Sequence, residues 1–158
     1  VLKKGGLQIT FLLCMLIESI MWCGCFIIIM GGSENLLLSV LERHIILEQF
    51  YLAIGAGIWE ELLFRLAFIG IIVYFLRKII RYSQLFSTLI AIIIGAFLFS
   101  YFHYIGEFGD LFTYRSFALR SIAGIFLGSL YIFRGFGITV YTHIFYDMAI
   151  ISIPILFE

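Results

Sequence analysis

The sequence predicts an all-α membrane protein, a single domain built as a bundle of about five transmembrane helices. Of the 158 residues, 63% are apolar and only 13% are charged, whereas a soluble domain is about 45–50% apolar and about 25% charged. Long apolar runs with one proline favour helices, because lipid offers no hydrogen bonds to an open backbone. Ten Lys and Arg balance ten Asp and Glu, so there is no positive field to attract a nucleic acid. The expected surroundings are a lipid bilayer.

The apolar segments follow one another through short polar connections. The first covers residues 7–30 and is too long for the core of a signal peptide, so we expect a retained helix. It ends at Gly31-Gly32-Ser33, where Ser33 can cap an interfacial stretch over residues 34–48. The other helices are expected at residues 50–76, 85–103, 117–133 and 138–157, with a tight turn at 134–137. No internal repeat is present, so residues 1–158 are expected to form one domain; a first residue other than Met is compatible with a fragment.

Small residues in these helices are interpreted as packing positions. Gly124 and Gly128 form a Gly-x-x-x-Gly seam, which lets another backbone approach closely. We expect this seam to pack within the chain rather than to form a dimer. Cys14, Cys23 and Cys25 all fall in the first helix, and they are interpreted as small apolar residues rather than as a metal site.

Ionisable residues inside apolar helices are costly, and they are functional candidates for that reason. Glu61 and Arg65 are four residues apart, in the acid-first order that favours an ion pair on one helical face. Glu60 is rotated by about 100° from Glu61, so it can face a cavity while Arg65 neutralises its neighbour. We expect the Glu61–Arg65 ion pair to be turned away from that cavity. The purely structural alternative is a Glu61–Arg65 pair beside a protonated Glu60. Glu18, in the first helix, is expected to be protonated or bonded to a neighbouring helix rather than to be catalytic.

Two further apolar helices carry histidine. His103 ends one of them, and His143 lies four residues before Asp147 in another. Each histidine alone fits a packing or interfacial role, but three helices that each bring a carboxylate or an imidazole need a common explanation. We therefore predict that Glu60, His103 and His143 converge on one cavity, with polar atoms within about 3–7 Å.

Such a cavity favours hydrolysis by an activated water. Two imidazoles and two carboxylates can remove a proton from water and stabilise an oxyanion. No cysteine lies near these residues, and no Gly-x-Ser-x-Gly elbow surrounds Ser100, so a nucleophilic triad is not expected.

The motifs Glu60-Glu61-x-x-x-Arg65, Phe99-x-x-x-His103 and His143-x-x-x-Asp147, in this order on three helices, resemble those of the CPBP intramembrane endopeptidases. That family includes the type II CAAX prenyl proteases and the bacterial Abi and lysostaphin-resistance-like proteins. The resemblance covers residues 54–150 and leaves the helix at 7–30 outside. It implies an integral membrane protein, expected in a prokaryotic cell membrane, that cleaves a membrane-associated peptide or protein.

The resemblance also implies roles for the residues. Glu60 would activate water with the help of His103, His143 and Asp147 would line the oxyanion site, and Glu61 with Arg65 would hold the helix geometry. The type II CAAX enzymes have Asn where this chain has Asp147, whereas bacterial relatives allow Asp or Asn. Because an ionised Asp cannot donate to an oxyanion, Asp147 is expected to be protonated, to orient His143 or to ligate a metal.

Three alternatives to this hydrolase stay open. His103, His143 and either Glu60 or Asp147 could instead hold a catalytic zinc; we favour the metal-free form because no His-Glu-x-x-His motif is present. An inactive scaffold or immunity-type binding protein is the second alternative. An ion or proton pathway is the third, although these residues cluster rather than follow one helix face.

One length relation constrains the arrangement. Glu60 lies 17 residues before Arg77, about 25 Å along a helix, whereas His143 lies only 7 residues after Phe136, about 10 Å. If both helix ends sat at the same membrane face, Glu60 and His143 could not meet. We therefore expect the turn at residues 134–137 to lie within the bilayer.

Overall fold

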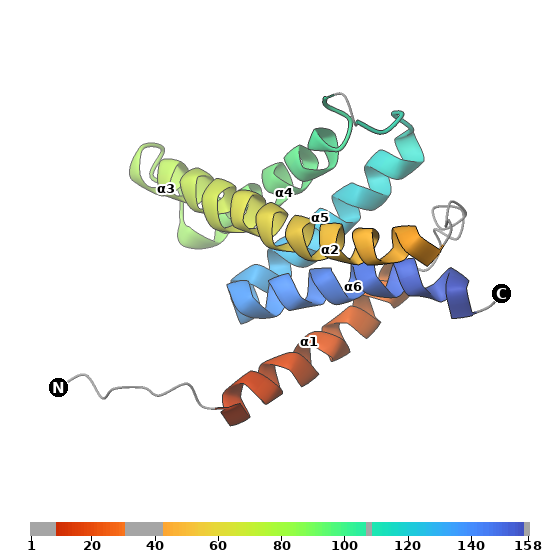
Figure 1. The fold of residues 1–158 in the computed structure, drawn as a ribbon. Helices are drawn as coiled ribbons and strands as arrows, with labels where there is room; N and C mark the ends of the chain where they lie inside the picture. Colours follow the sequence, from red (N-terminus) through yellow and green to blue (C-terminus); the bar gives the residue numbers. More distant parts are fainter. Residues whose placement is uncertain (1–8, 31–42, 107–108, 157–158) are drawn as a thin grey trace.

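The computed structural model describes residues 9–30, 43–106 and 109–156, and within these ranges every regular element is helical (Figure 1). The elements are α1 (Ile9–Met30), α2 (Arg43–Glu61), the π-helix η2 (Leu62–Ile69), α3 (Gly70–Lys78), α4 (Gln84–Phe102), α5 (Tyr114–Arg134) and α6 (Phe136–Leu156). The predicted all-α fold is confirmed. Because α2, η2 and α3 follow without a break, the described residues form five helical segments. By length and composition, α1, α4 and α5 could each cross a membrane.

The expected boundaries are close to the observed ones, with one clear error. The second helix was expected to begin at Phe50, after an interfacial stretch over residues 34–48, but α2 begins at Arg43. Residues 43–48 therefore continue the helix that carries the site, while residues 34–42 and the expected cap at Ser33 lie outside the described part of the chain.

The turn between α5 and α6 lies beside the middle of α1. Arg134, the last residue of α5, forms an ion pair with Glu18 of α1. Ser19 Oγ donates to the Ile138 carbonyl at 3.4 Å, and a Cβ added to Gly137 would lie 2.7 Å from Cε of Met15. The start of α6 is thus level with the centre of a candidate membrane span. This position beside the middle of α1 agrees with the expected place of the turn, whose depth in a bilayer stays a prediction. The pairing of Glu18 with a neighbouring helix is confirmed.

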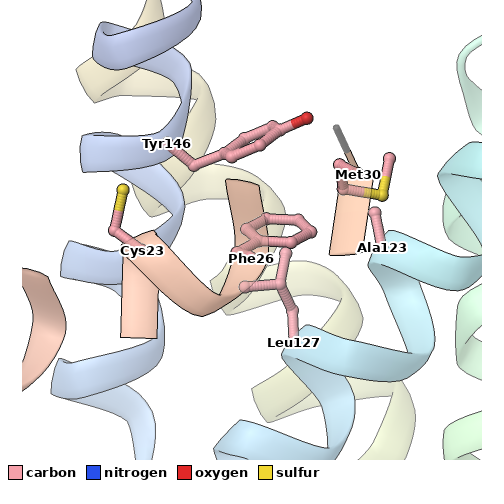
Figure 2. Packing of buried hydrophobic residues seen from close by; sticks show 6 residues of the cluster. All are labelled: Cys23, Phe26, Met30, Ala123, Leu127 and Tyr146. Atoms are coloured by element: carbon pink, nitrogen blue, oxygen red, sulfur yellow. The ribbon is translucent and has the colours of Figure 1, made fainter. Parts of the chain in front are cut away.

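An aromatic core joins α1 to α5 and α6. Phe26 of α1 is 1% exposed and stacks on Phe126 of α5 at 4.7 Å and on Tyr146 of α6 at 4.1 Å between ring centroids. Figure 2 shows Phe26 between Tyr146 and Leu127, with Cys23 and Met30 from the same helix at the edge of the cluster. Cys23 is buried there as a free thiol, which agrees with its interpretation as a small apolar residue.

α4 packs on α5 along the glycine seam. A Cβ added to Gly124 would lie 2.8 Å from Cα and 2.9 Å from Cβ of Ala96, and one added to Gly128 would lie 3.3 Å from Cγ2 of Ile92. Gly95 of α4, which adjoins Ala96, lies close to Ile69 of η2. The expectation that Gly124 and Gly128 pack within the chain is confirmed.

Replacing Gly124 with Ala should destabilise the fold, although Ala is the better helix former. The added methyl would press on the backbone of Ala96, and overpacking of this kind costs about 1–3 kcal/mol. Thermal unfolding in detergent measures the change. Gly70→Ala is the matched control, because nothing lies within 4 Å of its new Cβ. An equal effect of the two substitutions would show that α4 and α5 are not in close contact at Gly124.

Candidate active site

Glu60 lies between the two imidazoles that the sequence singled out. Its Oε1 is 4.0 Å from Nε2 of His103, and its Oε2 is 3.9 Å from Nε2 of His143. The three side chains come from α2, from the residue that follows α4, and from α6. The predicted convergence of these groups within about 3–7 Å is confirmed, while their chemical roles stay predictions.

The position of His103 fixes its tautomer. α4 ends at Phe102, one residue earlier than expected, and His103 is its C-cap. Its Nδ1 lies 2.8 Å from the carbonyl oxygen of Phe99. Because a carbonyl oxygen only accepts, Nδ1 must carry the proton and donate it. When the ring is neutral, Nε2 is an acceptor on the side that faces Glu60.

Glu61 contacts the ring nitrogen of His143 that does not face Glu60. This nitrogen, Nδ1, donates to Glu61 Oε1 at 2.7 Å, and the other oxygen of Glu61 lies 3.0 Å from Nε of Arg65. The predicted Glu61–Arg65 pair is confirmed, and neither side chain lines the cavity, as expected. The hydrogen bond between His143 and Glu61 was not predicted. Glu61 is fully buried, so its second oxygen needs a hydrogen-bond donor, and the imidazole of His143 supplies one. Glu61 therefore orients His143 as well as pairing with Arg65.

Phe99 contacts both Arg65 and His103. From the sequence it was identified only as the first residue of the motif that ends at His103. Its ring lies 4.5 Å from the guanidinium carbon of Arg65, and its centroid lies 4.8 Å from that of His103. Arg65 is 2% exposed, and both of its Nη atoms lack hydrogen-bond partners in the described part of the chain. The electron-rich ring face of Phe99 offsets part of the cost of that buried cation. The signal for this role is the spacing of four, which places Phe99 on the His103 face of α4.

Asp147 is close to the same imidazole. Its Oδ2 lies 3.6 Å from Nε2 of His143, and its side chain is 29% exposed. The expectation that His143 and Asp147 share a face of the helix is confirmed. Nε2 of His143 thus faces two carboxylates, those of Glu60 and Asp147, while Nδ1 is taken by Glu61.

A cavity of about 210 Å³ adjoins these groups. Its polar wall includes His103, His143 and Asp147, and Glu60 lies next to it in contact with both imidazoles. The remaining lining residues are mostly apolar and come from four helices; they are Phe26, Met30, Phe99, Arg120, Ala123, Leu127 and Tyr146. Figure 2 shows five of them, with the Tyr146 ring above Phe26 and Leu127. The wall from α1 and the cation Arg120 were not anticipated from the sequence.

The candidate zinc ligands are present here, but they are spread around Glu60. Within the ranges that the structure describes, no three His, Cys, Asp or Glu side chains are grouped closely enough to hold a metal ion. Without a metal, the carboxylate of Glu60 and the imidazole of His103 can bind a water between them. The imidazole of His143 can then polarise a substrate carbonyl.

Comparison with known proteins identifies the family of this chain. No curated protein and no solved structure matches it significantly. The family model of the Rce1-like type II CAAX prenyl endopeptidases matches residues 42–149, which is more than half of the chain. The match contains all six predicted site residues and leaves α1 outside. With three apolar helices that could span a bilayer, this is an integral membrane protein. The chain belongs to the Rce1-like family of type II CAAX prenyl endopeptidases.

Proposed function

We propose that the chain is an intramembrane endopeptidase that hydrolyses a peptide bond of a membrane-associated substrate with an activated water. The observation that carries this proposal is the Glu60 carboxylate, about equally far from the Nε2 atoms of His103 and His143 at 4.0 and 3.9 Å. Membership in a protease family supports the reaction class.

The gap between Glu60 and His103 suits one bridging water. A water at about 2.8 Å from each partner spans the 4.0 Å between Oε1 and Nε2 with an angle of about 90° at its oxygen. It donates one hydrogen to the carboxylate and the other to the Nε2 lone pair, since Nδ1 of His103 is occupied by the Phe99 carbonyl. Both lone pairs of the water oxygen are then free to face a substrate carbonyl.

The reaction needs no covalent intermediate with the protein. The water oxygen attacks the carbonyl carbon while its proton passes to Glu60. When His143 carries both protons, its Nε2–H donates to the oxyanion that forms, and its Nδ1–H stays on Glu61. The C–N bond then breaks as Glu60 returns its proton to the leaving amine. The products are a new carboxyl group and a free amine.

Neither Ser100 nor Cys23 lines the cavity. Ser100 is buried and donates to the Phe117 carbonyl at 2.8 Å. Cys23 belongs to the aromatic core of α1 and α5. This supports water rather than a side chain as the nucleophile.

A lipid-anchored peptide of the CAAX type is the substrate class that the family description favours, and a bacteriocin-type leader peptide is the alternative. We place the chain in a prokaryotic cell membrane. The competing function is an inactive scaffold or immunity-type protein that binds a peptide in the same cavity, and it predicts binding without cleavage.

Glu60→Gln should abolish cleavage of a membrane-tethered peptide while leaving the fold nearly unchanged. The amide keeps the shape of the side chain but cannot take the proton of water, and losing a general base costs about 10²–10⁴-fold in rate. Mass spectrometry of the peptide in proteoliposomes measures the rate, and thermal unfolding measures the fold. Glu48→Gln, on an exposed position of the same helix, is the control and should cleave normally. Undiminished cleavage by Glu60→Gln would mean that the base is elsewhere.

Asp147→Asn separates the metal-free mechanism from the zinc alternative. If Asp147 lines the oxyanion site, the amide adds a donor and the cleavage rate stays within about tenfold of the unsubstituted protein. If Asp147 is a zinc ligand, the neutral amide binds the metal poorly and cleavage is lost. We expect tolerance of Asp147→Asn and no inhibition by a chelator in the same assay. Loss of cleavage in both experiments, with recovery on adding zinc, would establish the metalloprotease.

A further inference from the structure

One cation lines the cavity that the proposed mechanism uses. Among the described residues of its wall, Arg120 is the sole Lys or Arg. It lies on α5 three residues before Ala123 and seven before Leu127, so these three share one helical face, and all line the cavity. That face extends about 10 Å along the helix. A group bound at Arg120 therefore occupies the same cavity as His103, His143 and Asp147.

Contacts within the protein hold the guanidinium of Arg120 in place but do not use all of its N–H donors. Nη1 donates to Ser116 Oγ at 2.9 Å, Nη2 pairs with Asp110, and the guanidinium carbon lies 5.3 Å from the Tyr104 ring centroid. Arginine has five N–H donors, so the donors beyond these two contacts have no protein partner in the part of the chain that the structure describes. The side chain is 19% exposed, and a ligand can therefore reach it.

Asp110, the carboxylate that pairs with Arg120, can be displaced by another carboxylate. Asp110 precedes α5 and is 56% exposed, so it is solvated and can return to water without losing a buried position. A carboxylate that enters the cavity can take its place on Arg120. This exchange keeps the local charge balanced, because one anion replaces another.

The charge around the reacting groups makes such a contact necessary for an anionic substrate. Glu60, Glu61 and Asp147 bring three carboxylates to the site, while Arg65 is already engaged by Glu61. An entering carboxylate would be repelled by them unless a cation received it. A guanidinium is well suited to this, since its planar fork binds a carboxylate through two parallel hydrogen bonds.

We propose that Arg120 binds a carboxylate of the peptide substrate, and so selects peptides that carry a negative charge close to the bond that is cut. The proposal rests on the proposed function for the identity of the substrate. The carboxylate can come from the C-terminus of the peptide or from an acidic side chain, and both sources have the same chemistry at Arg120.

The test uses one membrane-tethered peptide with an apolar C-terminal sequence in three forms. The first form is the free acid, the second is the C-terminal amide, and the third is the amide with Glu in place of the last residue. Binding of each fluorescent form to the Glu60→Gln protein in detergent gives Kd without turnover. Cleavage by protein with Glu60 intact gives KM and kcat separately.

The free acid should bind at least about tenfold more tightly than the amide, as expected for a charge-assisted pair. The difference should appear in KM rather than in kcat. Arg120→Met should remove this preference, and Arg120→Lys should retain part of it, because the ammonium keeps the charge but loses the fork. Recovery of tight binding by the third form identifies side-chain carboxylates as a second source, and weak binding of it restricts recognition to the C-terminus.

Asp110→Asn and Arg77→Met serve as further variants. Asp110→Asn removes the competing carboxylate, so it should lower the Kd of the free acid. Arg77→Met removes an exposed cation at the end of α3 and should leave the preference unchanged. The acid-to-amide ratio is an internal measure, so partial misfolding of a variant does not alter it.

Equal binding of acid and amide, no binding of the acid, or an unchanged preference in Arg120→Met would overturn the proposal. Failure of the proposed function gives a different result. In that case the free acid still binds through Arg120, but protein with Glu60 intact cleaves none of the forms.

Discussion

The buried carboxylate of Glu61 is the interaction on which the rest of the site depends. It is completely excluded from solvent, and it connects Arg65 on η2 with His143 on α6. A carboxylate without partners in such a place would cost several kcal/mol. Any rearrangement that separates α2 from α6 therefore exposes the Glu61 carboxylate to solvent or removes its hydrogen bond with His143. The geometry of the candidate catalytic groups is a consequence, since Glu60 is the adjacent residue and faces the imidazole that Glu61 orients.

The helices can make this contact because α6 starts beside the middle of α1. Its first turn is level with Glu18 and Ser19 of α1, which brings His143 to the height of Glu60. α2 and α6 pack against each other and run antiparallel in Figure 1. Gly57 permits the close approach, because a Cβ there would lie 2.7 Å from Cγ1 of Ile144. The ion pair between Arg134 and Glu18 and a glycine one turn before Glu60 thus help to position the reacting groups.

Much of this arrangement could be predicted from the sequence, because ionisable residues are rare in apolar helices and their cost implies a shared site. Glu60, His103 and His143 were identified in this way, and the position of the turn at residues 134–137 beside the middle of α1 agrees with the expectation from helix lengths. The hydrogen bond between Glu61 and His143 was not predicted, because the spacing of residues on one helix does not show which side chains a second helix brings to them. The π-helical winding of Leu62–Ile69 has no signal in its residues that we recognise.

The wall of the cavity was the least predictable part. Phe26 and Met30 belong to a helix outside the matched region, and in the sequence they are two apolar residues among many. Arg120 was not singled out by the sequence motifs, although it lines the cavity. Which residues face the cavity depends on the rotation of α1 and α5 about their axes. Packing at Gly124 and at the stacked rings of Phe26 and Tyr146 sets that rotation.

The most direct measurement of the central claim is a double-mutant cycle on unfolding free energy in detergent, with Glu61→Gln and His143→Gln made singly and together. Residues in direct contact within one buried network show coupling of about 0.5–3 kcal/mol. We predict coupling above about 1 kcal/mol, because Glu61 and His143 share a buried 2.7 Å hydrogen bond. Additive effects of the two substitutions would contradict the account, since they would mean that Glu61 does not hold His143.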